Sequence, residues 1–213
     1  MVRVYHTFFS IQGESTFAGL PCFFIRLAGC PMRCTYCDSL SACESPGQIV
    51  SVDDLVDEAV SSGNSLVEVT GGEPLAQSET WTLLSRLCDR FDHVLLETGG
   101  GVSIQGVDPR VRIILDVKCP GSGMSGRMCL ENFSLMHSYD RELKFVVSHR
   151  QDFEWAVGFV QEHRLEQENL LVSPITPGIE PAVLAEWVLD APVVFRMQLQ
   201  MHKLIWPNGG DDR

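Results

Sequence analysis

The chain has 213 residues, of which 45% are hydrophobic and 21% are charged, with a formal net charge of −12. This length and composition predict one well-buried globular domain, and the acidic charge argues against broad nucleic-acid binding, which needs a basic surface. No apolar run approaches the roughly 18 residues of a membrane span, and the start lacks a signal-peptide core, so we expect a cytoplasmic protein without membrane contact.

Short apolar segments rich in β-branched residues alternate with helical patterns, which predicts a mainly parallel sheet. The predicted strands are residues 22–27, 66–70, 94–98, 112–118, 142–147, 169–173 and 193–200, and the predicted helices are residues 52–62, 78–90, 152–164 and 181–189. Strands outnumber helices, so an open or partial β/α barrel fits better than a closed eight-fold one. We predict an α/β fold with a single domain over residues 1–206 and a flexible tail over residues 207–213.

Polar residues recur at every second position in several predicted strands. Those that share a face are Glu68 with Thr70, Asp116 with Lys118, Glu142 with Lys144, and Arg196 with Gln198, Gln200 and His202. Solvated edge strands would account for one or two such faces, but not for so many in one sheet. The pattern therefore predicts a polar lumen that serves as a substrate site. Lys118 and Lys144 either pair with Asp116 and Glu142 as a structural network or line this site.

Three cysteines, Cys30, Cys34 and Cys37, have the spacing C-x3-C-x2-C on one short segment. A closed zinc site takes four protein ligands, and an electron-transfer iron–sulfur cluster usually takes four cysteines. Three thiolates can instead hold a 4Fe–4S cluster with one iron open to a substrate or cosubstrate. Cys43 has the wrong spacing for this loop, although zinc held by the triplet with Cys43 or a histidine is an alternative.

A predicted strand ends in Gly71-Gly72-Glu73, where two glycines allow a close backbone approach. Together with the cysteine triplet, this turn resembles the radical S-adenosylmethionine superfamily. The resemblance implies that Cys30, Cys34 and Cys37 bind the 4Fe–4S cluster, that residues 71–73 bind the methionine group of S-adenosylmethionine, and that Tyr36 lies near its adenine. Reductive cleavage of S-adenosylmethionine would then give a radical that abstracts a substrate hydrogen.

Further motifs resemble the 7-carboxy-7-deazaguanine synthase family over nearly the whole chain. They are residues 8–14, 21–26, 37–39, 97–98, 116–122, 142–147 and 198–203. The resemblance implies conversion of 6-carboxy-5,6,7,8-tetrahydropterin to 7-carboxy-7-deazaguanine with release of ammonia, on the route to queuosine and other 7-deazapurines. It also implies a Mg²⁺ requirement, a homodimer and a reductase such as flavodoxin.

The same resemblance assigns the remaining site residues. It implies that Ser39 binds Mg²⁺, that Ser122 and Ser173 contact the adenosine, and that the substrate is bound by Gln12, Gly13, Glu14, Arg26, Thr70, Gln200 and His202. Arg26 also offers a bidentate fork for a substrate carboxylate, and amide and carboxylate groups match the donor and acceptor edge of a pterin. The alternatives are an activase that installs a glycyl radical on a protein, an iron–sulfur electron carrier, and a non-catalytic metal-binding protein.

Overall fold

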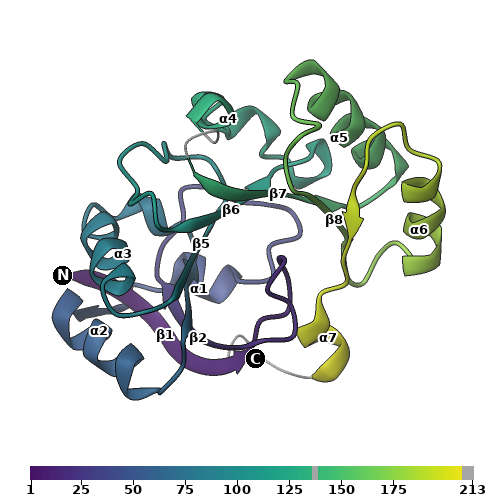
Figure 1. Cartoon of the computed structure of the whole chain (residues 1–213). Coiled ribbons are helices and arrows are strands. Elements are labelled where there is room, and N and C mark those ends of the chain that lie inside the picture. The colour runs from purple at the N-terminus through teal and green to yellow at the C-terminus, as the bar shows by residue number, and fades with distance from the viewer. Residues whose placement is uncertain (136–138, 208–213) are drawn as a thin grey trace.

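The computed structural model describes residues 1–135 and 139–207, and within them nine strands form one curved sheet (Figure 1). The strands are β1 (Val2–Ile11), β2 (Pro21–Leu27), β3 (Gln48–Val50), β4 (Leu66–Gly71), β5 (His93–Thr98), β6 (Arg112–Val117), β7 (Asp140–Val147), β8 (Leu170–Pro174) and β9 (Arg196–Met197). Their order is β3-β1-β2-β4-β5-β6-β7-β8-β9. β1 runs antiparallel to β2 and β3, whereas every pair from β2–β4 to β8–β9 is parallel. In the described residues β3 and β9 do not pair with each other, so the sheet is the predicted partial barrel.

Most of the helices cover the outer side of this sheet, whereas the first and the last border its inner side (Figure 1). The helices are α1 (Leu40–Glu44), α2 (Val52–Ser61), α3 (Thr80–Cys88), α4 (Glu131–Leu135), α5 (Arg150–Glu162), α6 (Pro181–Leu189) and α7 (Met201–Ile205). At the start of α2, the Asp54 backbone N–H donates to the Ser51 side chain at 3.0 Å, which confirms the predicted N-cap. Of three one-turn 3₁₀ helices, Pro74–Ala76 follows β4, and Pro120–Ser122 and Ser125–Arg127 lie between β6 and α4.

The two faces of each central strand have different partners because successive side chains point to opposite sides. On β4, Val67 and Val69 are fully buried in the main apolar core, which is shared with residues of α2, α3 and α5. Glu68 and Thr70 point to the inner side. This arrangement explains how parallel strands can carry polar residues at alternate positions while remaining buried.

Two parts of the strand prediction differ from the structure. The strand predicted at residues 193–200 is wrong, because only Arg196–Met197 pairs with β8. Beyond it, the Gln198 side chain bonds to the Ser15 backbone, and Gln200 starts helix α7, so Gln200 and His202 are not strand residues. The ten-residue strand β1 was not predicted, although its burial alternates in a period of about two that sequence alternation can reveal.

The described residues contain no helix that is both long and apolar enough to cross a bilayer. Of the predicted tail, only Pro207 lies within the described residues, so a flexible tail stays a prediction.

Candidate functional site

A cavity of about 550 Å³ lies on the inner side of the sheet. Its wall contains every site residue predicted above except Ser122 and Ser173: Gln12, Gly13, Glu14, Arg26, Cys30, Cys34, Tyr36, Cys37, Ser39, Thr70, Gly71, Gly72, Glu73, Gln200 and His202. The volume suits a small-molecule ligand site. Segments from both ends of the chain thus meet in one place.

The cysteine triplet lies on the loop between β2 and α1, and hydrogen bonds hold this loop against two other strand ends. Thr35 donates its backbone N–H to the Ser122 carbonyl at 3.1 Å and its hydroxyl to the Gly121 carbonyl at 2.7 Å. The Glu73 N–H donates to the Gly29 carbonyl at 2.9 Å. The loop is therefore placed by the ends of β4 and β6, with Cys30, Cys34 and Cys37 partly exposed to the cavity.

The thiols of the triplet have the chemistry of cluster ligands. The buried Cys43 thiol lies on α1 with its Sγ 3.8 Å from the Sγ of Cys37. Hydrogen bonds from Cys43 lower the pKa of Cys37 to about 6 and that of Cys30 to about 7, whereas burial raises the pKa of Cys34. Two of the three sulfurs therefore ionise readily, as a metal ligand must.

In residues 1–135 and 139–207, no group of three or more His, Cys, Asp or Glu side chains is arranged to hold one metal ion. A closed zinc site built from the triplet and Cys43 would need such an arrangement. Three thiols on one loop without a fourth ligand suit a 4Fe–4S cluster with one open iron.

The Gly-Gly-Glu turn packs directly on the cysteine loop. A Cβ at Gly71, where φ is +145°, would overlap the Leu27 backbone, and one at Gly72 would overlap the Gly29 carbonyl. Glycine is therefore required at both positions. The buried Glu73 carboxylate accepts from the Thr98 hydroxyl at 2.8 Å and from the Gly99 N–H at 2.9 Å, while burial raises its pKa.

A buried charge network forms another part of the wall. Lys144 Nζ donates to Glu14 Oε2 at 2.7 Å, contacts Glu97 Oε1, and lies 3.6 Å from Asp116 Oδ2. Burial opposes ionisation of Glu14, but Lys144 and a hydrogen bond from Gln200 hold its pKa below the usual range. Lys118 pairs with Asp116 at 2.9 Å. Both lysines line the cavity and both are paired. Lys118 has the partner that the sequence suggested, Asp116, whereas Lys144 pairs with Glu14, Glu97 and Asp116 and not with Glu142.

The C-terminal segment closes one side of the cavity. The Met201 N–H donates to the Gly13 carbonyl at 3.0 Å, and a Cβ at Gly13 would overlap the His202 ring. Gln200 Nε2 donates to Glu14 Oε1 at 2.8 Å, and Lys203 Nζ lies 3.0 Å from Asp38 Oδ2. Burial lowers the pKa of His202, so its ring is neutral near pH 7.

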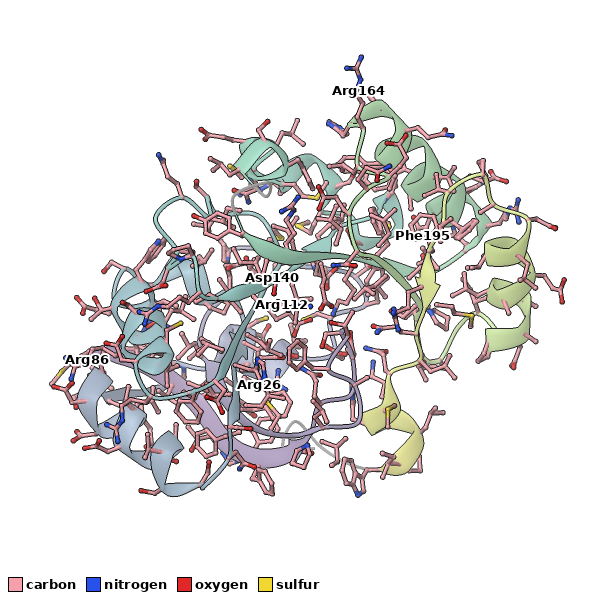
Figure 2. The ribbon with its side chains drawn as sticks, viewed as in Figure 1. Arg26, Arg86, Arg112, Asp140, Arg164 and Phe195 are labelled. Carbon is pink, nitrogen blue, oxygen red and sulfur yellow. The ribbon has the colours of Figure 1, made fainter. Side chains whose placement is uncertain are left out.

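Arg26 enters the cavity from β2 and lies toward the middle of the molecule in Figure 2, whereas Arg86 and Arg164 lie at its periphery. Its Nη1 donates to the Ser39 hydroxyl at 3.1 Å, and its Nε is buried without a hydrogen-bond partner among the described residues. Such a guanidinium retains capacity to bind an anion in the cavity.

Three sequence predictions fall outside this wall. The Ser122 hydroxyl donates to the Cys119 carbonyl at 2.6 Å, and the Ser173 hydroxyl is buried with no partner in the part of the chain that the structure describes. Their contact with adenosine stays a prediction. Glu142 does not pair with Lys144: it accepts from Arg112 at 3.0 Å and from the Thr16 N–H at 3.0 Å. Thr16, on the loop between β1 and β2, and Arg112, on the neighbouring strand β6, therefore occupy the two oxygens of Glu142. Figure 2 shows Arg112 beside Asp140 at this place.

Several wall residues were absent from the predicted site. They are Phe8, Phe24, Asp38, Glu68, Glu97, Ile114, Lys203 and Trp206. The polar pattern of the strands already singled out Glu68, and the family motifs included Asp38, Glu97 and Lys203. The family motifs also contained Phe8 and Phe24, but no sequence signal identifies Ile114 or Trp206, because an apolar side chain that faces a cavity cannot be distinguished in the sequence from one in the core.

The fold and the cysteine loop define the class as radical S-adenosylmethionine enzymes, and residues 24–119 match the sequence model described as the Radical SAM superfamily. Enzymes of this class use a 4Fe–4S cluster and S-adenosylmethionine. The 7-carboxy-7-deazaguanine synthase of Chlorobaculum tepidum is 46% identical, over 96% of this chain and 94% of that protein. The one of Koribacter versatilis is 38% identical, over 92% and 93%. The chain belongs to the 7-carboxy-7-deazaguanine synthase family.

A solved structure agrees with this fold. The crystal structure of QueE from Escherichia coli superposes with a TM-score of 0.70 at 22% identity, and covers 92% of this chain and 93% of that one.

Proposed function

We propose that this protein converts 6-carboxy-5,6,7,8-tetrahydropterin to 7-carboxy-7-deazaguanine and ammonia in 7-deazapurine biosynthesis. The observation that carries the proposal is that one cavity joins the cysteine triplet and the Gly-Gly-Glu turn to the polar groups of Gln12, Glu14 and Gln200. Substrate and product differ by one ammonia, so the conversion is redox-neutral overall. S-adenosylmethionine can then be regenerated in each turnover.

Within this proposal, Cys30, Cys34 and Cys37 hold the cluster, and Gly71, Gly72 and Glu73, with Tyr36, bind S-adenosylmethionine. When bound, the two cofactors supply the radical that removes a hydrogen atom from the substrate. The hydroxyl of the half-buried Tyr36 donates to the Val146 carbonyl at 3.0 Å, which fixes its ring at the cavity wall. Ser122 and Ser173 belong to the same proposed cofactor site.

The substrate would be held at both ends. Arg26 binds its carboxylate as a forked donor, and Mg²⁺ would add an oxygen-ligand site at the Ser39 hydroxyl, next to the Asp38 carboxylate. Glu14, which is ionised, accepts from the ring donors of the pterin, and Thr70, Gly13, Gln12, Gln200 and His202 complete the contacts. The Thr70 hydroxyl donates to Glu97 Oε2 at 3.0 Å, which leaves its oxygen lone pairs toward the cavity.

The cellular setting belongs to the same proposal. All eight cysteines are free thiols, which suits the reducing cytoplasm. A reductase such as flavodoxin and a homodimeric assembly follow from family membership. A glycyl-radical activase would need the cluster but not the polar contacts that Gln12, Glu14 and Gln200 make with one another.

The test is anaerobic turnover of the reconstituted enzyme with dithionite, S-adenosylmethionine, Mg²⁺ and the carboxytetrahydropterin. We expect a product with the mass of 7-carboxy-7-deazaguanine, and none from Cys34→Ala. Cleavage of S-adenosylmethionine without that product would refute the proposed substrate.

A further inference from the structure

Glu68 is a buried carboxyl in the cavity wall that has no role in the function proposed above. It lies in the middle of β4, is 3% exposed, and is paired across the sheet with Phe24 and Leu95. Around it are the apolar side chains of the inner layer: Phe8, Cys22, Phe24, Leu66, Leu95 and Ile114. A carboxyl is costly in such surroundings unless a ligand or partner compensates for it.

One oxygen of Glu68 has a defined partner. The Gln12 amide nitrogen donates to Oε2, and the Gln12 amide oxygen accepts from the Glu14 N–H at 2.9 Å. The orientation of the Gln12 amide is therefore fixed at both ends. This leaves Oε1 of Glu68 as the group that faces the cavity.

The basic side chains of the site form ion pairs with carboxylates other than Glu68. Lys144 contacts Glu14, Glu97 and Asp116, and in the described part of the chain no basic side chain forms an ion pair with Glu68. Burial and the nearby Glu97 carboxylate raise the pKa of Glu68 well above its usual range. A protonated carboxyl carries one O–H donor beside one acceptor oxygen.

A protonated Glu68 therefore offers a hydrogen-bond donor, which the neighbouring ionised carboxylates lack. Ionised carboxylates only accept, so they match a ligand edge that carries two donors, such as the amino group and ring N–H of a pterin. The O–H that a protonated Glu68 carries at Oε1 can instead donate to a ring carbonyl, the acceptor that stands beside the ring N–H in a lactam edge. We propose that Glu68 contacts the substrate and selects rings that present a lactam edge to this end of the cavity. The inference rests on the proposed function.

The experiment measures substrate binding without turnover. The holoenzyme, with cluster and S-adenosylmethionine but no reductant, is titrated with the carboxytetrahydropterin. Glu68→Gln keeps a donor and an acceptor in the same shape, and we expect its Kd to stay within about threefold of the parent. Glu68→Leu removes both, and we expect its Kd to rise by about tenfold or more. Cluster content and S-adenosylmethionine affinity should not change.

Two controls separate contact from structure. Glu168→Gln neutralises another buried carboxyl, one that pairs with Arg141 at 2.6 Å outside the cavity wall, and should leave the Kd unchanged. The second control repeats Glu68→Leu in a Gln12→Ala background. A direct contact keeps its effect there, whereas a residue acting only through Gln12 loses it. If the leucine variant does not fold, Glu68→Ser, which removes the carboxyl and leaves room for water, replaces it.

Each outcome decides the matter. A Kd for Glu68→Leu within twofold of the parent, or an effect that disappears without Gln12, would overturn the proposed contact while the parent still binds the pterin. A parent enzyme that does not bind the pterin at all would refute the proposed function, and the contact with it.

Discussion

Replacing Lys144 by methionine tests whether the cavity depends on one shared cation. In the parent, Lys144 is 4% exposed and lies against the carboxylates of Glu14, Glu97 and Asp116. Methionine keeps most of the apolar stem but removes the charge. The three carboxylates then stay partly buried without their shared cation, and among the described residues Lys118 forms an ion pair with Asp116 but not with Glu14 or Glu97.

The expected loss follows from the burial of this network. Removing one partner of a buried ion pair costs about 3–5 kcal/mol, because the remaining charge is left without compensation. For a chain of this length such a loss corresponds to a fall in Tm of roughly 6–20 °C. The matched control is Arg150→Met, whose exposed ion pair with Glu154 should contribute no more than about 1 kcal/mol.

The loss should also depend on pH. In the parent, the pKa of Glu14 is held below its usual range, so its contribution to stability is present above the unfolded pKa and is lost as pH falls. Without Lys144, burial raises that pKa above the unfolded value, and stability is lost as pH rises through it. The difference in Tm between variant and parent should therefore grow from about pH 5 to about pH 8.

Thermal unfolding followed by circular dichroism, on anaerobically purified protein across this pH range, gives the measurement. A second variant, Lys144→Met with Glu97→Gln, should recover part of the loss because one uncompensated charge is removed. A fall in Tm no larger than that of Arg150→Met, or one that is the same at every pH, would refute the reasoning.

Two further predictions concern the cofactor site, and a third concerns the C-terminal side of the cavity. Gly72→Ala places a Cβ against the Gly29 carbonyl and should abolish S-adenosylmethionine binding measured by equilibrium dialysis, whereas Gly158→Ala, with open space around it, should bind normally. Cys37→Ala should lose most of its iron after reconstitution, measured by iron analysis, and the buried Cys119→Ala should retain it; equal iron contents would count against the triplet. Lys203→Met should raise the pKa of Asp38, because desolvation favours the protonated carboxyl and Lys203 is the group that holds this pKa low. The variant should also raise KM more than it lowers kcat. An unchanged KM would contradict a role of α7 in closing the cavity.

The sequence was sufficient for the parts of the site that are local. The three cysteines and the Gly-Gly-Glu turn each lie on a few consecutive residues, so the positions of these residues relative to one another can be predicted from their spacing in the sequence. The polar lumen also followed from alternation, because Glu68 and Thr70 must share a face of any strand that contains them.

The remaining contacts depend on how the sheet curves. Lys144 bonds to Glu14 and Glu97, which are 130 and 47 positions away, and no local pattern states that these residues meet. The strand predicted at residues 193–200 failed for the same reason. Its polar residues bind the loop after β1, and Gln198 and Gln200 are explained by Ser15 and Glu14 rather than by a neighbouring strand.

The ratio of product formed to S-adenosylmethionine consumed tests the central claim most directly. It is measured by quantitative mass spectrometry in one anaerobic reaction with excess carboxytetrahydropterin. A redox-neutral loss of ammonia predicts many molecules of 7-carboxy-7-deazaguanine for each S-adenosylmethionine lost. Stoichiometric consumption of S-adenosylmethionine without the deazaguanine would contradict the account.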